Sequence, residues 1–496
     1  MIELMTVNAE RIDLASTVIT IEQSNTFFAS NTVLRGGFSY PIQLAHTSKN
    51  RRIFKFFDLL ETNPSHPQIP VFMRMNGRFH TEAILQLGMA SGGFSGHLLL
   101  KNAAINEKLD ASKLTDIRFP VFDIGDRDAL WNNMVSTRSK NKSSETPYTF
   151  LPTKNNDFFS SVDPKQDRVL NHSIGLAFQQ NSPDKWAPIV PYFYLCNVLE
   201  NMARYLNLNL CGDFAQHADV QKLVITNPVG LGLPYGIKIN AKNHLPPLPL
   251  KEFFKELSIF FGTTVRIADS DLNISFKKSV FDRPMYMDWT GKKMSIISQE
   301  FTPIRDGFHL SADAEGLDQK DEVIVGNGKI KINAKVASLP FCSLQGHPNP
   351  IPEYKCKGVL LPHGFKADEK TKDLYAKPGE PPNFPLRLLF CNNDGAPKSS
   401  NTGHYFNLKM SGRNGLYEFA HSPWMEKTHA ARVIKIRVLL NGADLQQLDE
   451  SKIIRLKSIS GAVVECMWRR LTFSASEGQN IIPAEVELVV LNPSKI

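Results

Sequence analysis

The sequence has few cysteines, and none of them are closely spaced. The six thiols lie far apart, and no Cys-x-x-Cys pair occurs among Cys196, Cys211, Cys342, Cys356, Cys391 and Cys466. Secreted domains that rely on disulfides carry many cysteines in a short chain. This pattern therefore excludes a disulfide framework and predicts reduced thiols.

The sequence also lacks a long apolar run. No stretch reaches the roughly 18 apolar residues that a membrane-spanning helix needs. The start, MIELMTVNAERIDL, is interrupted by Glu3 and Glu10 and lacks a basic segment followed by an apolar one. It does not resemble a secretory signal peptide. We expect a protein that is made in the cytoplasm and has no membrane anchor.

Charge of one sign is not in large excess. Lysine and arginine total 57 against 49 for aspartate and glutamate, a formal net charge of +8. A basic balance can attract nucleic acid or anionic surfaces. Here basic and acidic residues are interspersed, so we interpret them as a mixed solvated surface rather than a nucleic-acid site.

Catalytic and phosphate-binding motifs are missing as well. The chain has no GxSxG, HExxH or GxxxxGK[ST] motif. Residues 230–232 (GLG) lie in a proline-bounded loop and predict a turn rather than a phosphate cradle. Cys342, His347, Cys356 and His363 are too loosely spaced for a structural zinc site, whose ligands come in close pairs.

Two further polar clusters have structural interpretations. Asp269 and Asp271 fit a turn whose backbone they hydrogen-bond, whereas a glycosidase needs two carboxylates set across a cleft. His421, Trp424 and His429 are interpreted as a packing cluster beside the last β region. We therefore predict no catalytic, cofactor-binding or metal-binding residues, no cofactor, and a protein that is not an enzyme.

Length and hydrophobic periodicity predict three regions. A chain of 496 residues suggests roughly two to four domains. Alternating apolar residues and turn signals such as Asn76-Gly77 predict strands near both ends of the chain. The predicted class is α+β, mostly β. Two tube-like β-barrel or sandwich domains, at 1–125 and 286–496, flank an α+β insert at 126–285.

Two helices are predicted within this insert. Pro191 is predicted to open the first helix, in which apolar residues recur at helical spacing, and Pro249 precedes a second apolar stripe at 251–261. Gly262 is a natural end for the second helix because positive φ costs a glycine nothing. A pair of strands is predicted to follow within 263–276.

Two long stretches have the composition of loops. Residues 136–188 are polar, and residues 340–400 are rich in proline and glycine. Long loops without secondary structure are usually functional or disordered. We predict that both contact neighbouring subunits.

A short segment that mixes arginines with aromatic residues is a candidate contact surface. Arginine beside exposed aromatic rings is typical of single-strand nucleic-acid platforms and also of protein interfaces. We favour an interface, formed by Phe38, Tyr40, Arg51, Arg52, Phe54 and Phe56.

Three patches of the sequence carry a family resemblance. Residues 36–44 (GGFSYPIQL) and 47–54 (TSKNRRIF), with the strands and hairpin that follow, resemble structural tail proteins of phages and prophages of Bacteroidetes-type bacteria. The helix and hairpin at 249–276 and the ending GADLQQLDESKIIRL resemble them too. Such proteins look like baseplate hubs, related to the hub of contractile-injection spikes.

The resemblance implies a structural virion protein with no catalytic residues. It implies a homotrimer in which each subunit supplies two tube-like β domains, so that the ring bridges the tail tube and the spike or tip. Other partners would be further baseplate proteins, and DNA would pass through the lumen without specific binding. The alternatives are a distal-tail adaptor, a fibre-attachment protein and a glycan-binding or hydrolytic tail protein.

Overall fold

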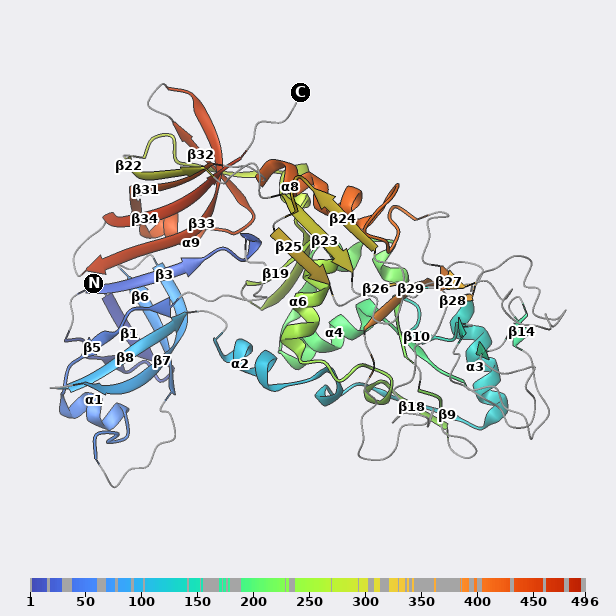
Figure 1. Cartoon of the computed structure of the whole chain (residues 1–496). Helices are drawn as coiled ribbons and strands as arrows, with labels where there is room; N and C mark the ends of the chain where they lie inside the picture. Colours follow the sequence, from blue (N-terminus) through green and yellow to red (C-terminus); the bar gives the residue numbers. More distant parts are fainter. Residues whose placement is uncertain are drawn as a thin grey trace. The chain divides into compact units, whose positions relative to one another are not determined.

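The chain divides into two compact units, each built from separate stretches of sequence. Unit 1 comprises Met1–Lys108, Lys277–Asp306 and Pro423–Ile496, and unit 2 comprises Leu109–Phe276 and Gly307–Ser422. The predicted division at 1–125, 126–285 and 286–496 stays a prediction. The structure, a computed structural model (Figure 1), describes residues 2–15, 18–28, 38–59, 68–75, 79–90, 93–100, 103–140, 142–151, 153–154, 169–171, 173–174, 177–178, 189–227, 229–231, 237–268, 270–292, 294–301, 307–312, 321–328, 330–334, 337–338, 341–342, 361–362, 384, 386–391, 397–398, 404–428, 432–457, 461–476 and 481–491.

Unit 1 contains a single sheet of fourteen strands. Its first part is the meander that the alternating sequence predicts, and β6, β7 and β8 pair antiparallel in sequence order. The predicted Asn76-Gly77 turn lies outside the described residues. The elements of this part are β1 (Ile2–Thr6), β2 (Arg11–Ile12), β3 (Val18–Ser24), the 3-10 turn η1 (Thr26–Phe28), β4 (Phe38–Ser39), β5 (Ile42–Leu44), α1 (Ser48–Ile53), β6 (Gln68–Met75), β7 (Phe79–Ala90), β8 (Gly93–Leu100) and α2 (Ala103–Ala111).

The second part of the same sheet comes from the end of the chain. β31, β34, β33 and β32 pair antiparallel, as the predicted C-terminal strands require. A short helix, α9, follows β31 and begins with a reciprocal cap between Asn441 and Asp444. The elements are α7 (Ser279–Asp282), β21 (Met285–Asp288), β22 (Met294–Phe301), α8 (Ser422–Thr428), β31 (Arg432–Asn441), α9 (Gly442–Gln447), β32 (Lys452–Lys457), β33 (Val463–Ser476) and β34 (Ile481–Val490).

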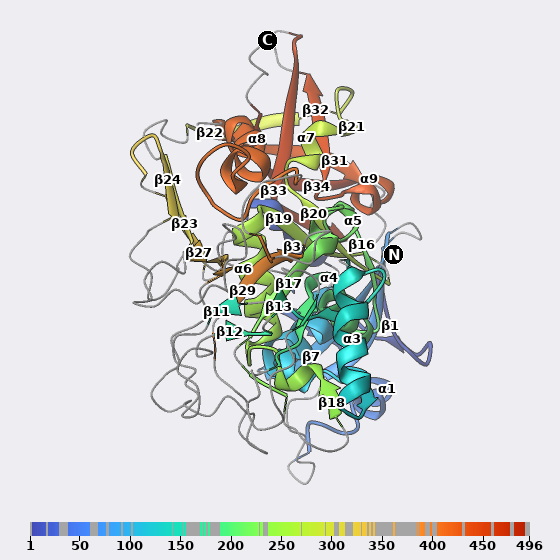
Figure 2. The ribbon, with the colours of Figure 1, turned by 90° about the vertical axis from the view of Figure 1, so that its right-hand side faces the viewer.

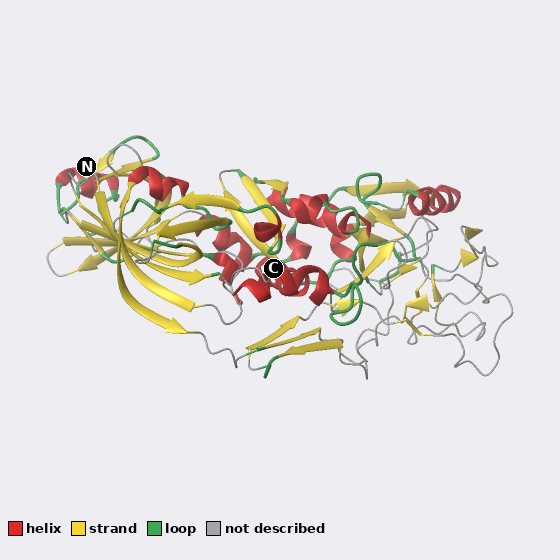
Figure 3. Ribbon diagram, turned by 90° about the horizontal axis from the view of Figure 1, so that it is seen from above, coloured by secondary structure: helices red, strands yellow, loops and turns green. Residues whose placement is uncertain are grey.

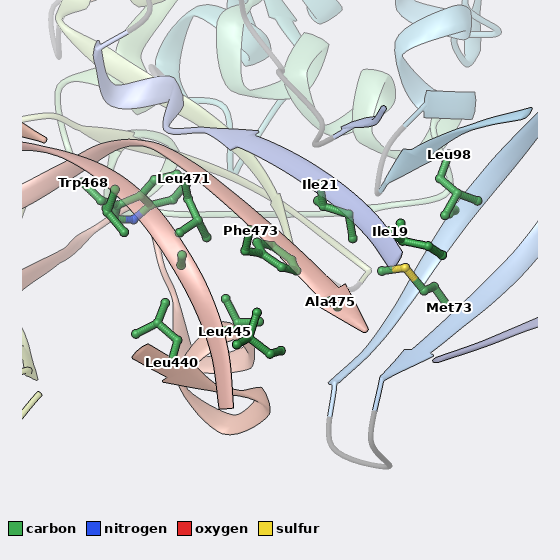
Figure 4. Packing of buried hydrophobic residues seen from close by; sticks show 14 of the residues in the cluster. Ile19, Ile21, Met73, Leu98, Leu440, Leu445, Trp468, Leu471, Phe473 and Ala475 are labelled. Carbon is green, nitrogen blue, oxygen red and sulfur yellow. The ribbon is translucent and has the colours of Figure 1, made fainter. Parts of the chain in front are cut away.

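One pair of strands joins the two parts. β3 runs antiparallel to β33 from the pair Val18 and Ser476 to the pair Ser24 and Arg470. We call this ladder the seam. Alternate residues on both strands face one apolar core, and Figure 4 shows Ile19 and Ile21 of β3 with Leu471 and Phe473 of β33. The two β regions of the sequence therefore share one core.

The two edges of the C-terminal strands are linked by a short bend. β21 pairs in parallel with β32, and β22 pairs with β31. Only residues 289–293 separate them, so their facing ends lie at most about 20 Å apart. Trp289 fills this bend, being 1% exposed and part of the core.

The predicted fold class is confirmed. Among the described residues strand is the commoner state, at 45% against 27% helix, and no sheet that they form closes into a barrel. Figure 3 shows the strands of unit 1 as a fan of yellow arrows. The sheets are open, so unit 1 retains strand edges that a closed barrel would not have.

Unit 2 is built around the two predicted helices, although Pro191 does not open the first, because a short strand at Tyr192–Tyr194 separates it from the start of α4 at Leu195. α4 and α6 bury most of their residues, and α6 ends at Gly262 in the left-handed conformation (φ 60°), as predicted. β19 and β20 then form the expected hairpin; Figure 2 shows α6 beside β19. The bounds are α4 (Leu195–Tyr205), β16 (Asn209–Cys211), α5 (Asp213–Gln216), η3 (Val220–Lys222), η4 (Ala241–Asn243), α6 (Leu250–Phe261), β19 (Thr263–Ala268) and β20 (Asp271–Phe276).

The remaining elements of unit 2 form small sheets. The prediction that 136–188 is entirely loop is wrong at its start, because the last turn of α3 (Arg127–Ser139) occupies 136–139. The side chain of Asp126 caps the start of this helix. Most of 340–400 lies outside the described residues. The strands are β9 (Val121–Gly125), β10 (Tyr148–Thr149), β11 (Thr153–Lys154), β12 (Val169–Leu170), β13 (Ser173–Ile174), β14 (Ala177–Phe178), β15 (Tyr192–Tyr194), β17 (Leu223–Thr226), β18 (Ile237–Asn240), β23 (Phe308–Ala312), β24 (Asp321–Val325), β25 (Ile330–Ala334), β26 (Ala337–Ser338), β27 (Phe341–Cys342), β28 (Leu361–Pro362), β29 (Arg387–Cys391) and β30 (Pro397–Lys398), with η2 at Leu114–Asp116 and a π-helical turn at Tyr417–His421.

Candidate assembly surface

The predicted contact segment is built on α1, a short helix that the sequence patterns did not reveal. Thr47 caps it, because its hydroxyl accepts a hydrogen bond from the Asn50 backbone N–H. The Asn50 side chain is fully buried; it accepts from the Asp13 N–H and donates to the Asp13 and Ala45 carbonyls at 2.8 and 2.7 Å. These bonds fix α1 against the strands beside it.

Ion pairs hold the rest of the segment. Arg51 pairs with Asp58 at 2.7 Å, and His46 lies 3.3 Å from the same carboxylate. The Arg51 guanidinium lowers the pKa of Asp58, although partial burial opposes it. Arg52 pairs with Glu10 at 3.0 Å on the exposed side. Both predicted arginines are therefore engaged in holding the segment together.

The aromatic residues of the segment face opposite ways. Phe54 is 3% exposed and packs edge-on against Phe94 at 5.0 Å between ring centroids, so it belongs to the core. Phe56 is 46% exposed. Both Lys55 and Phe56 have positive φ, 54° and 55°, a conformation that costs a non-glycine residue about 1–2 kcal/mol. The hydrogen-bonded frame of α1 holds this strained pair at the surface.

Tyr40 lies at the seam and not beside α1. Its hydroxyl donates to the Glu22 carboxylate at 3.3 Å, and Arg470 pairs with the same carboxylate across the seam at 2.5 Å. Tyr40 is 45% exposed. The Phe38 backbone pairs with Glu22 and Leu99, and its side chain lies outside the described residues. The six predicted interface residues therefore divide among the α1 segment, the core and the seam.

The sequence patterns missed a strand edge that exposes two neighbouring apolar side chains. β22 has β31 as its one partner in the described part of the sheet. Ile296 and Ile297 are 47% and 45% exposed, and the register shifts between Ile296 and Ser298. An edge strand presents unpaired backbone groups to any strand that can align with it. The run MSIISQEF has the composition of such a strand.

The opposite edge, β21, combines exposed apolar and aromatic groups. Met285 and Tyr286 are 52% and 40% exposed. The Arg455 guanidinium stacks on the Tyr286 ring at 3.5 Å from its centroid and also pairs with Glu465 at 3.2 Å. Tyrosine and arginine are enriched among the residues that anchor protein interfaces.

The polar clusters of the sequence give no sign of chemistry where they are described. No group of three or more His, Cys, Asp or Glu side chains in the described residues is placed to hold a metal ion. Of the loosely spaced cysteines and histidines, His347, Cys356 and His363 lie outside the described residues, as does His429. His421 is buried, and its ring Nε2 lies 3.1 Å from the Phe260 carbonyl. Among the described helices, none has the length and apolar character needed to cross a bilayer.

The comparisons with known proteins gave structural likenesses only. No family model and no curated protein matches the chain. It is similar to the 43 kDa tail protein of prophage MuSo2 from Shewanella oneidensis, with 8% identity, 98% of this chain and 97% of that chain covered, and a TM-score of 0.34. It is also similar to prophage tail protein gp18 from Listeria monocytogenes EGD-e, with 6% identity, 100% of this chain and 95% of that chain covered, and a TM-score of 0.36. The tail protein from Neisseria meningitidis MC58 is similar with 8% identity, 98% of this chain and 95% of that chain covered, and a TM-score of 0.33.

Proposed function

We propose that this chain is a structural subunit of a phage tail, and specifically a baseplate hub that assembles as a homotrimer. The observation that carries the proposal is the open edge of β22, with two neighbouring isoleucines exposed. An exposed apolar strand edge promotes aggregation unless another chain covers it. A ring of identical subunits covers every such edge at once, because each copy donates one surface and accepts another.

The arrangement of the chain supports the same role. Unit 1 is strand-rich and comes mainly from both ends of the sequence, whereas the longest helices, α3, α4 and α6, lie in a stretch that interrupts it. The family resemblance of the sequence attributes this order to hubs that bridge a tail tube and a spike or tip. On this proposal the protein is a virion component and not an enzyme. It contacts the tail tube, the tip and other baseplate proteins, and DNA passes through the ring.

The test is the mass and shape of the purified chain. We expect a trimeric ring by mass photometry and negative-stain microscopy. Ile297→Lys places a charge at the edge of β22, a natural device against strand pairing, and should leave a folded monomer. Val7→Lys adds the same charge at a turn residue that is 61% exposed and should leave the ring intact.

The other outcomes are equally informative. A sixfold ring would replace the hub with a distal-tail adaptor. A wild-type monomer at micromolar concentration, with unit 1 fully protected from hydrogen exchange, would overturn the proposal that copies of the chain cover the edge.

A further inference from the structure

The three separate chain segments of unit 1 meet at one aromatic side chain, Phe27. It is 1% exposed and lies directly after the seam strand β3. The neighbouring Asn25 ties this turn to the C-terminal strands, because its side chain donates to the Trp468 carbonyl at 2.8 Å and accepts from the Phe27 N–H at 2.9 Å. The first segment is therefore anchored firmly at this point.

The other two segments reach Phe27 just where the chain enters unit 1. Lys277 is the first residue of the middle segment, and Trp424 is the second residue of the last. The Trp424 ring meets the Phe27 ring edge-on at 6.0 Å, and Phe281 of α7 meets it at 5.9 Å. The Lys277 ammonium lies 4.6 Å from the Trp424 centroid and 5.3 Å from the Phe27 centroid. A single cation thus contacts aromatic rings from both other segments.

The Lys277 ammonium is an unusual group to find among packed aromatic rings. No carboxylate among the described residues pairs with the Lys277 ammonium. Ring faces attract a cation, but removing an unpaired ammonium from water is costly. Burial lowers the pKa of Lys277 to about 8, because the ammonium loses hydration at this position. An uncharged side chain of the same length would pack here without that loss.

We propose that the Phe27–Lys277–Trp424 cluster is the release point of unit 1, a latch that opens before the sheet does. Opening it frees α7 and residues 423–428 of α8, which begin next to the two points where the chain re-enters the unit. The fourteen-stranded sheet stays folded, because its ladders and core do not depend on the latch. Segments that move in folded proteins come from the least stable contacts. The proposal does not depend on the hub assignment.

Hydrogen exchange measured by mass spectrometry on the full chain tests the latch. Lys277→Met keeps the length of the side chain and removes its charge. We expect exchange in α7 and in residues 423–428 to slow by about tenfold, while exchange in β31–β34 is unchanged. Lys457→Met, at an exposed position on β32, is the matched control and should change neither region.

A second variant removes one of the two aromatic rings that the Lys277 ammonium contacts. Trp424→Leu removes the aromatic face and should speed exchange in α7 and residues 423–428 without affecting β31–β34. Unchanged or faster exchange in Lys277→Met would overturn the proposal, since it would show that the ammonium is a net stabilising contact. Loss of protection throughout the sheet in Trp424→Leu would also overturn it, since the latch would then be part of the core.

The pH dependence gives an independent readout. A lysine whose pKa falls from 10.5 to about 8 on folding binds fewer protons folded than unfolded between those values. Wild-type stability should therefore rise from pH 8 to 10.5, and Lys277→Met should lack this rise. The titratable residues on the neighbouring elements are Lys278, Asp282 and Arg283 on or beside α7, Glu426 and Lys427 on α8, and Glu450, which accepts a hydrogen bond from Thr26 of η1. Burial is the one cause of the shift in the pKa of Lys277. A rise of equal size in Lys277→Met would assign it to those groups and overturn this part of the proposal.

Discussion

Two parts of the molecule differ in the sequence distance between the residues that contact one another. They are the hairpin unit of α6, β19 and β20 and the seam between β3 and β33. The first lies within residues 250–276, and every contact in its hairpin joins residues close in sequence. The second joins residues more than 440 positions apart, because Ser24 pairs with Arg470. Local patterns specify the first almost completely. The seam depends instead on two strands that fit each other but lie too far apart in sequence for a local pattern to connect them. Four experiments, ordered by expected effect, sharpen this contrast.

Phe260→Ala should give the largest effect, because it empties a buried site in the local unit. Phe260 is fully buried and packs edge-on against Phe261 at 4.9 Å. We expect a loss of about 4 kcal/mol in the free energy of unfolding of unit 2, measured by urea denaturation. Lys255→Ala, on the less buried side of α6, is the control and should stay within about 0.5 kcal/mol. An equal loss in both variants would contradict the assigned inner face.

His244 makes the stability of unit 2 dependent on pH. Burial lowers the pKa of His244 from 6.5 to about 4, despite its contact with the Val229 carbonyl. The folded state thus resists protonation, so stability is complete above pH 6.5 and falls as the pH drops towards 4, by about 3 kcal/mol. His244→Gln should flatten this slope in denaturation curves, and His97→Gln, at an exposed position, should not. A slope that survives His244→Gln would have to come from other groups.

Gly262→Ala tests whether the hairpin unit needs the left-handed backbone conformation at the end of α6. Gly262 has φ 60°, and a Cβ atom there would lie 3.2 Å from the Ala420 carbonyl and from the His421 ring. We expect a loss of more than about 1 kcal/mol by thermal unfolding. Gly291→Ala, where a Cβ would meet nothing within 4 Å, should be nearly neutral. If the two glycines responded alike, the left-handed end of α6 would not be a constraint.

Glu22→Gln should give the smallest effect, because the seam has a backbone ladder that survives it. The substitution keeps the shape and removes the charge facing Arg470. Since Arg470 is 47% exposed, solvent screens the pair, and the loss should be about 1 kcal/mol or less. Glu465→Gln, in the more exposed pair with Arg455, should lose still less. Equal losses would mean that the burial of Glu22 adds nothing to the seam.

The same contrast explains what could be predicted from the sequence. The end of α6 at Gly262, the hairpin after it and the C-terminal strands follow from periodicity and turn chemistry. The helix α1 could not be found this way, since its six residues show no apolar stripe and its stability comes from Asn50, whose partners Asp13 and Ala45 lie outside the helix. The cap residues Thr47 and Asp126 were the available signals for α1 and α3.

The six interface residues stay a prediction. The sequence could not tell that Phe54 turns inward, because adjacent aromatic residues look alike until the backbone direction is known. The β22 edge was missed for a related reason. An isoleucine looks the same in the sequence whether it is exposed or buried, and only the position of its strand within the sheet distinguishes the two cases.

The seam also sets the order of events during synthesis. Residues 470–476 leave the ribosome about 450 residues after the strand with which they pair. At roughly 5–20 residues per second, that strand waits for about 25 to 90 seconds. During this interval the helices and hairpin of residues 195–276 are already complete and free to form. Until then β4 can pair with one edge of β3 while the other edge stays open, and a chaperone that covers this open edge would reduce misfolding of the nascent chain.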